Sequence, residues 1–296
     1  MKQSEVMAMR GLIDRGSPKV SRSSRFPIAG ICLLMPLFIC GIFGPFFYPH
    51  DPTTMDLSRA LQPPGFMAGG GWSYFLGTDH LGRDLLTRLI EGARGSLIVA
   101  IFGVGLAGLV GVSLGMLAGY FGGVVDNIIM RIVDTMMSIP AFLLAILLAA
   151  SLGGGMTTII FSISIIFWTG YARVIRGETL SIKQREFVVL AEVTGCGRIR
   201  ILMKHIFPNV VNTGVVLATL QLGSAIMIEA ALTFLGLGLQ PPASAWGLII
   251  SEGRTYLSTA WWIPTFSGFA IMMAVLGSNL TGDWLRDALD PKLRQI

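Results

Sequence analysis

The sequence contains few charged residues, few cysteines and few histidines. Asp, Glu, Lys and Arg make up 13% of its 296 residues, whereas hydrophobic residues make up 53%. Soluble globular domains carry about 25% charged residues, so this composition excludes an ordinary soluble protein and favours an integral membrane protein. Cys32 and Cys40 lie in an apolar stretch and Cys196 lies in a polar one, which excludes a disulfide framework.

Catalytic motifs are also missing. No glycine-rich loop ends in Gly-Lys-Ser or Gly-Lys-Thr, so the chain lacks the phosphate-binding loop of ATPases. An intramembrane serine protease is a natural rival, but no Gly-x-Ser-Gly motif is present. His50, His80 and His205 lie outside the apolar stretches, and no pair of histidines or cysteines has metal-ligand spacing. The sequence therefore predicts a protein that is not an enzyme and has no cofactor and no metal site.

Apolar stretches of about 20 residues, the length that crosses a bilayer core of ~30 Å, occur six times. The predicted spans are 28–48, 97–119, 131–151, 157–175, 213–236 and 261–280, with a tight turn at 151–155. The first span is expected to be a retained helix, because its uncharged run is too long for a cleaved signal peptide. The predicted fold is an all-α membrane protein with six transmembrane helices.

The basic residues are distributed unevenly between the spans. They are concentrated in the 1–27 N-terminal segment, the 176–212 loop and the 281–296 tail, and are sparser in the 49–96 and 237–260 loops. The positive-inside rule then predicts that both termini and the 176–212 loop are cytoplasmic. The 49–96 and 237–260 loops are predicted to be periplasmic. The net charge of +5 is thus interpreted as membrane orientation in the cell inner membrane, and no nucleic-acid partner is expected.

The end of the first periplasmic loop, residues 81–94, has the pattern of an amphipathic helix. Its leucines oppose charged residues that include Asp84 and Arg88, a favourable i,i+4 pair, and Thr78 or Asp79 is the expected N-cap. We expect this helix to lie on the outer surface and to lead into the second span. Its charged face is either solvated or in contact with an external delivery protein.

Several residues inside the spans predict contacts between helices. Three glycines recur four residues apart in the second span: Gly111, Gly115 and Gly119. They form a face without side chains, which predicts close packing on another helix. Asp134 follows Arg131 by three residues, which predicts a local ion pair. Glu229 is the only acid well within the fifth span, where a lone carboxylate costs several kcal/mol. It is therefore expected to face the translocation path or a partner, or to make a structural hydrogen bond to a neighbouring helix.

A polar stretch, residues 173–209, interrupts the apolar sequence and holds two short amphipathic runs. They are hinged at residues 195–197, and Pro208 is expected to stop the second run. The apolar residues that share one face of each run are Phe187, Val188, Leu190 and Ala191, then Ile199, Leu202, Met203 and Ile206. A helix–turn–helix with an apolar stripe, on the basic side of a membrane bundle, predicts a docking surface for a partner.

The same stretch resembles the cytoplasmic coupling motif of ABC-importer permeases. The residues that carry this likeness are Glu186, Phe187, Val188, Ala191, Gly195 and the run 205–209. Further groups narrow the resemblance to the shorter permease subunit of the dipeptide and oligopeptide systems, in the peptide/nickel family: 76–79 with 82–84, 234–238 with 240–242, 246–247, and 282–292. Val189 stands where the general motif has an acidic residue. The likeness runs from about residue 28 to the C-terminus.

The resemblance implies a type I ABC importer permease with its transmembrane domain over residues 80–290. Implied partners are a homologous permease in a heterodimer, two ATP-binding subunits that hydrolyse ATP, and a periplasmic or lipoprotein solute-binding protein. The implied ATPase-coupling residues are Glu186, Phe187, Leu190, Ala191, Gly195, Ile199, Leu202, His205 and Pro208. Glu229 is the candidate for the translocation path. ATP binding would close the ATPase dimer, and the bundle would change from inward-facing to outward-facing as the 184–207 hairpins follow.

The expected substrate is a di- or oligopeptide. The alternative is the same architecture importing nickel, a metal chelate, glutathione or an opine. A different class, a secondary transporter that works alone, is argued against by the lack of inverted repeats with broken helices.

Overall fold

The computed structural model describes residues 27–48, 50–67 and 72–289. Within these ranges the regular secondary structure is helical, apart from one isolated β-bridge. The predicted all-α class is therefore confirmed. The basic cluster of the N-terminal segment and the end of the tail, 290–296, lie outside the described residues.

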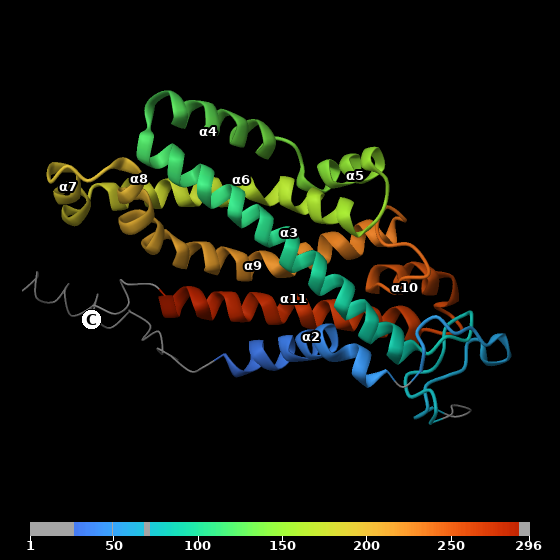
Figure 1. Ribbon diagram of the computed structural model, residues 1–296. Coiled ribbons are helices and arrows are strands. Elements are labelled where there is room, and N and C mark those ends of the chain that lie inside the picture. Colours follow the sequence, from blue (N-terminus) through green and yellow to red (C-terminus); the bar gives the residue numbers. More distant parts are fainter. Residues whose placement is uncertain (1–26, 49, 68–71, 290–296) are drawn as a thin grey trace, which may run out of the picture.

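Five long helices form the body of the molecule and run lengthwise beside one another (Figure 1). They are α2 (Ile28–Phe47), α3 (Leu85–Phe121), α6 (Met156–Lys183), α9 (Phe207–Phe234) and α11 (Trp262–Leu289). By length and composition the described residues hold five helices that can cross a membrane, or six if the bent pair α4 and α5 is one span. α3 packs against α6, α9 and α2, and buried side chains such as Val99, Ile163 and Ile226 form the core.

The third predicted span is wrong as a single helix. Residues 131–151 divide between α4 (Gly123–Met137) and α5 (Ala141–Leu152), whose axes differ by 88°. Pro140 explains the break, because its ring removes a backbone N–H and disfavours helical geometry in the residue before it. The predicted turn at 151–155 is confirmed, since α5 ends at Leu152 and α6 begins at Met156.

The predicted surface helix over 81–94 is also wrong. The helix begins at Leu85 and continues without a break into the second span as α3. Asp84 is the N-cap, and its carboxylate accepts a hydrogen bond from the Thr87 N–H at 3.1 Å, so neither predicted cap is used. Leu85 and Arg88 are fully buried. The amphipathic pattern therefore reflects a buried helix start and not a helix on the surface.

The glycine face of α3 packs against α6, as predicted. The space beside Gly111 is filled by the Trp168 carbonyl and Tyr171, and a β-carbon at Gly115 would lie 2.6 Å from the Ala172 carbonyl oxygen. A β-carbon at Gly119 would come within 2.8 Å of Thr179 Cβ. The absence of side chains thus lets the α3 and α6 backbones approach closely over about two turns.

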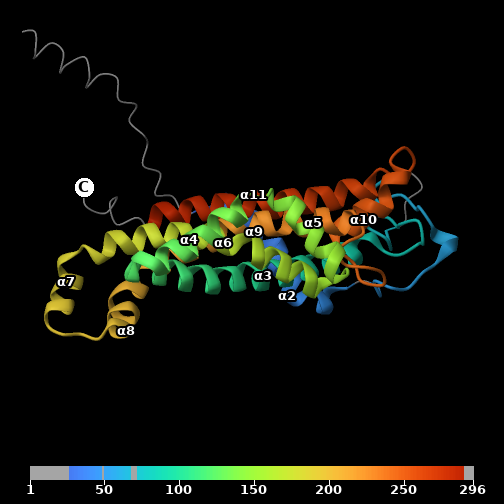
Figure 2. The ribbon, with the colours of Figure 1, turned by 90° about the horizontal axis from the view of Figure 1, so that it is seen from above.

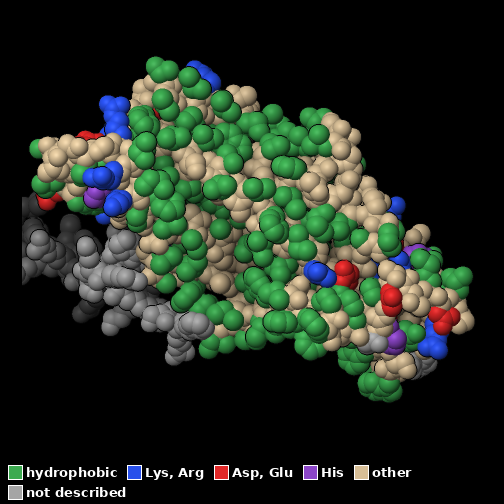
Figure 3. All heavy atoms as spheres, viewed as in Figure 1, with side chains coloured by type: hydrophobic (Ala, Val, Ile, Leu, Met, Phe, Trp, Pro, Cys, Tyr) green, Lys and Arg blue, Asp and Glu red, His purple; other side chains and the backbone are tan. Residues whose placement is uncertain are grey.

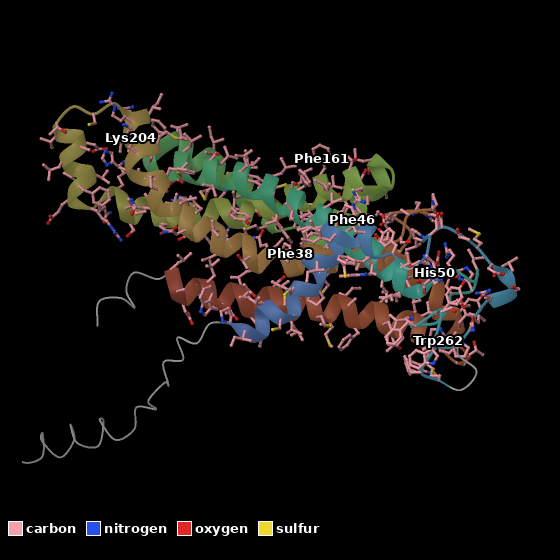
Figure 4. All side chains as sticks on the ribbon, turned by 60° about the horizontal axis from the view of Figure 1, so that its bottom comes forward. Phe38, Phe46, His50, Phe161, Lys204 and Trp262 are labelled. Carbon is pink, nitrogen blue, oxygen red and sulfur yellow. The ribbon has the colours of Figure 1, made fainter. Side chains whose placement is uncertain are left out.

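The two ends of the bundle are different (Figure 2). At one end, here named the hairpin end, α7 (Glu186–Val193) and α8 (Arg198–Ile201) project beyond the long helices. At the other, the loop end, lie residues 50–67 and 72–84 with η1 (Leu57–Arg59), α10 (Trp246–Gly253) and η3 (Arg254–Tyr256). Figure 4 places Lys204 at the hairpin end and both His50 and Trp262 at the loop end.

Pro208 does not end the second amphipathic run. A π-helical turn, η2 (Leu202–Ile206), joins α8 to α9, and Pro208 lies in the first turn of α9. In the π turn the Phe207 N–H bonds the Leu202 carbonyl. A first-turn proline is tolerated because its missing N–H is one that the helix does not need. The hairpin is therefore continuous with the bundle on this side.

Charged and apolar side chains are separated on the surface (Figure 3). On the face shown, Lys, Arg, Asp and Glu gather toward the two ends, and hydrophobic side chains cover most of the length between them. Exposed large apolar residues of this kind occur on α2, α3, α4 and α5, for example Phe46, Leu109, Ile128 and Leu147. An apolar belt between polar ends is the surface of a protein that lies in a bilayer.

Candidate functional site

The hairpin of α7 and α8 has two apolar faces instead of the single predicted stripe. Val188, Ala191, Leu202 and Ile206 are buried and pack with Ile175 and other side chains of the bundle. The other four residues of the predicted stripe are exposed: Phe187, Leu190, Ile199 and Met203. The prediction that Leu202 belongs to the docking stripe is therefore wrong, since only 6% of it is exposed and it supports the hairpin from inside.

The other face is an exposed apolar surface, here named the hairpin patch. It consists of Phe187, Val189, Leu190, Val193, Ile199 and Met203. Val193 and Ile199, on the two sides of the turn, are 81% and 76% exposed. Val189 and Val193 were missed by the sequence analysis, although their i,i+4 spacing on one helix is a detectable signal. Contiguous exposed apolar side chains on a segment that projects from the bundle mark an interaction surface.

The turn between the two arms has a fixed geometry. Gly195 has φ of +81°, and no atoms crowd the position of its missing side chain, so glycine is required there by conformation and not by packing. The N–H of Cys196 bonds the Ala191 carbonyl and the N–H of Gly195 bonds the Glu192 carbonyl, both at 3.0 Å. This pair of bonds is the Schellman motif, which ends a helix sharply. The predicted hinge is thus a rigid cap.

Further contacts hold the arms together and fix them to the bundle. The rings of Phe187 and His205 lie 6.3 Å apart, which joins α7 to the π turn. The Tyr120 hydroxyl donates to the Glu192 carboxylate at 3.3 Å, and Lys183 donates to the Tyr120 carbonyl at 2.7 Å. Glu186, the remaining predicted coupling residue, lies in the first turn of α7, where a negative charge favours the helix. These contacts therefore connect the hairpin to α3 and α6.

Two ion pairs connect α4 to α6 near this end. Asp134 pairs with Arg173, and Asp126 pairs with Arg176, whose Nη2 lies 2.6 Å from the carboxylate. The predicted local pair of Asp134 with Arg131 is wrong, because the bend at Pro140 lays α4 along α6 and brings a second helix within reach. Like the hairpin contacts, these ion pairs lie toward the hairpin end of the bundle.

Glu229 is fully buried where α9 meets α3. Its carboxylate accepts hydrogen bonds from the Ser96 hydroxyl at 2.8 Å and from the Thr233 hydroxyl at 3.0 Å. Thr233 Oγ1 in turn accepts the N–H of Leu239 at 3.3 Å. The expected hydrogen bond to a neighbouring helix is therefore confirmed. A place in a translocation path stays a prediction, because side chains of the same chain enclose the carboxylate.

We expect Glu229→Gln and Glu229→Leu to differ strongly. Glutamine retains polar atoms for both hydroxyls, whereas leucine leaves Ser96 and Thr233 buried without an acceptor, at about 1–3 kcal/mol for each unsatisfied group. The leucine variant should lower the midpoint temperature of thermal aggregation in detergent, and the glutamine variant should remain near wild type. Equal midpoints for the two variants would show that the hydrogen bonds do not stabilise the bundle.

A buried ion cluster at the loop end was missed by the sequence analysis. Arg88 Nη1 lies 2.5 Å from Asp79 and 2.8 Å from Glu252, while Arg83 contacts the same two carboxylates at 2.7 and 2.9 Å. The side chains of Asp79 and Arg88 are fully buried, so these arginines are not the solvated face that was considered. The sequence indicates only the Asp79–Arg83 pair of this cluster, through its four-residue spacing. Glu252 comes from α10, far away in the sequence.

The charges in this ion cluster cancel. Burial raises the pKa of Asp79, but the guanidinium charges of Arg88 and Arg83 and two backbone N–H donors outweigh it and hold the pKa below its ordinary value. Asp79, His80 and Glu252 also bring possible metal-ligand atoms within 4.8 Å of one another. Because the two guanidiniums already contact both carboxylates, the cluster is better suited to joining α3 to α10 than to binding a cation.

The chain matches two protein families. It matches the model described as a binding-protein-dependent transport system inner membrane component over residues 111–295. It also matches the model described as the N-terminal TM domain of oligopeptide transport permease C over residues 22–64. Together the two matches cover most of the sequence, including α2, the hairpin and α9.

Several characterised proteins are similar to this chain over most of their length. The di/tripeptide transport system permease protein DppC of Pseudomonas aeruginosa is 39% identical over 267 residues, which cover 90% of this chain and 88% of that protein. The oligopeptide transport system permease protein OppC of Bacillus subtilis is 37% identical, with 93% and 88% covered. The glutathione transport system permease protein GsiD of Pectobacterium atrosepticum is 38% identical, with 90% and 86% covered.

The fold is similar to that of a chain in the inward-facing MetNI methionine ABC transporter. The superposition has a TM-score of 0.55 and covers 70% of this chain and 98% of that one. The two sequences are 18% identical, so this likeness concerns the fold alone.

Proposed function

Since this chain belongs to the family of binding-protein-dependent transport system inner membrane components, we propose that it is the permease subunit of an ATP-driven importer of di- or oligopeptides. Support for the substrate class comes from the relatives, which are named for di/tripeptide, oligopeptide and glutathione transport. All three names denote short peptides. Nickel, a metal chelate or an opine is therefore a weaker alternative.

The observation that carries this proposal is the hairpin patch. Six apolar side chains are exposed on a hairpin that is hydrogen-bonded to α3. Such a surface fits a groove on an ATP-binding subunit, and movement of that groove would be transmitted through Glu192 and Tyr120 to the bundle. The chain itself is the conduit, and its two ATP-binding partners hydrolyse ATP.

Two further partners complete the proposed complex. A homologous permease would cover the face formed by α4 and α5, on which only Val133, Ala145 and Ala149 are buried. A solute-binding protein would dock at the loop end, where the ion cluster joins Arg83 and the start of α3 to α10. Each permease would then supply half of the translocation path.

Reconstituted transport tests the proposal. We expect proteoliposomes that contain this chain, the homologous permease and both ATPase copies to take up a radiolabelled dipeptide only when ATP and the binding protein are both present. The chain alone should carry nothing. Uptake by the chain alone, driven by an ion gradient, would contradict the proposal and identify a secondary transporter.

The proposed orientation places the hairpin end in the cytoplasm and the loop end outside, with N- and C-termini cytoplasmic. In a background with Cys32, Cys40 and Cys196 replaced by serine, a cysteine at Ser58 should react with an impermeant thiol reagent in intact spheroplasts. A cysteine at Ser181 should react only after the membrane is opened. Both positions are exposed, so the reverse pattern would overturn the orientation.

A further inference from the structure

A cavity of about 320 Å³ lies at the bend between α4 and α5, where these helices meet α6 and α9. Its walls include Met136, Pro140, Leu144, Phe167, Thr169 and Gln221. Most of these side chains are apolar, while Thr169 and Gln221 supply polar atoms. Met137 and Ile139, which also line it, are 48% and 41% exposed, so the cavity is open to the outside of this chain.

The polar atoms of the cavity are at the middle of the bundle. Thr169 is at the centre of α6 (Met156–Lys183) and Gln221 is at the centre of α9 (Phe207–Phe234). At 1.5 Å per residue, each is roughly 20 Å from either end of its helix. Both therefore lie near the midplane of a bilayer with a core of ~30 Å.

Gln221 carries an unsatisfied acceptor at this depth. Its Oε1 is buried and has no hydrogen-bond partner among the described residues. The Thr169 hydroxyl donates to the Ile166 carbonyl at 3.0 Å, which leaves its own lone pairs free to accept. A buried acceptor without a donor costs about 1–3 kcal/mol, and lipid has no donor to offer. A donor that enters from outside this chain would satisfy this acceptor.

The bend supports the same conclusion. The helix direction changes by 88° at residues 138–140, where the Ser138 N–H still bonds the Asp134 carbonyl and the Ile139 N–H bonds the Met136 carbonyl. Irregular backbone at membrane depth is tolerated where it is buried in protein or lines a water-filled cavity, and not where it faces lipid. This segment borders the cavity, since Ile139 and Pro140 line it together with Gln221.

We infer that this cavity is a substrate-contact site halfway along the translocation path. There Gln221 Oε1 accepts a hydrogen bond from a main-chain N–H of the peptide that is being transported. The inference rests on the proposed function and names the substrate contact within it. Every peptide with a free main-chain N–H can make this bond, whatever its side chains. The apolar walls, with flexible Met136 and Met137, adapt to side chains of different size.

Substitution of Gln221 tests the contact. In proteoliposomes with the whole complex, Gln221→Leu should lower the initial rate of ATP-driven dialanine uptake about ten-fold, the factor that corresponds to one hydrogen bond of ~1.4 kcal/mol. ATP hydrolysis stimulated by the binding protein should stay within about two-fold of wild type. The matched control is Thr219→Val on the same helix. Thr219 is half-buried, its hydroxyl bonds its own helix through the Val215 carbonyl, and the variant should leave uptake unchanged.

Accessibility gives a second and independent measurement. A cysteine at position 221, in the background without native cysteines, should react with a small charged thiol reagent in one nucleotide state of the complex. Saturating dialanine should slow that reaction. A cysteine that is unreactive in every state would show that lipid or a helix of the partner permease fills the cavity, and would overturn the inference even if the leucine variant assembles poorly.

The outcomes separate this inference from the proposed function. If the wild-type complex carries no peptide that its binding protein binds, the proposed function fails and the inference fails with it. If the wild-type complex carries dialanine and Gln221→Leu carries it equally fast, only the inference is wrong.

Discussion

Leu190→Asp is expected to reduce ATP-driven uptake at least a hundred-fold while the permease still inserts and assembles. Leu190 is 62% exposed on the hairpin patch, so the aspartate is solvated in the free subunit and has little effect on folding. In the complex it would lie in an apolar contact, where an unpaired buried charge costs several kcal/mol. Co-purification of the ATPase subunits and the initial uptake rate measure the effect.

Two variants make this result specific. Leu190→Met conserves volume and should retain uptake near the wild-type rate. Val188→Asp places a charge on the buried face and should prevent the hairpin from folding, which appears as loss of the purified subunit itself. If Leu190→Asp retained its ATPase subunits and transported normally, the hairpin patch would not be the docking surface.

Gly115→Ala should destabilise the subunit strongly, whereas Gly105→Ala on the same helix should not. A β-carbon at Gly115 would lie 2.6 Å from the Ala172 carbonyl oxygen and 3.0 Å from Ile175 Cβ. Backbone atoms cannot rotate away, so α3 and α6 must separate, at a cost of about 1–3 kcal/mol or more. No atom lies within 4 Å of the β-carbon position at Gly105.

The comparison uses one chemical change on one helix. Yield of monodisperse protein after detergent extraction and the midpoint of thermal aggregation should fall for Gly115→Ala and stay at wild-type values for Gly105→Ala. Alanine has a higher helix propensity than glycine, so the control could gain slightly in stability. Equal losses of yield and midpoint in both variants would mean that the glycines are needed for the flexibility of α3 and not for its contact with α6.

The features that were predictable from the sequence are those set by periodicity and local chemistry. The glycine face of α3 and the turn at 151–155 follow from spacing alone. Four of the predicted spans correspond to α2, α6, α9 and α11, and the last three extend beyond the predicted bounds on the hairpin side. Polar residues continue a helix outside the bilayer core, where a hydropathy window no longer detects them.

The features that were not predictable depend on partners distant in sequence. Arg83 and Arg88 have the pattern of a solvated face, and only Glu252, 164 residues after Arg88, makes them a buried cluster. Asp134 has a basic neighbour in sequence, yet the bend at Pro140 gives it a different one. In the hairpin the pattern identified the apolar positions except Val189 and Val193, but which of two apolar faces covers the bundle is decided by tertiary packing.

The ion cluster also bears on how the subunit is made. A ribosome adds about 5–20 residues per second, so Arg88 is synthesised roughly 8–33 s before Glu252. Until Glu252 is added, the cluster has two guanidiniums and only the carboxylate of Asp79, so the cluster by itself has one positive charge in excess. The excess disappears only when α10 is complete. A chain that terminates before Glu252 therefore keeps two arginines on one carboxylate, a charge imbalance within the cluster that the finished subunit does not have.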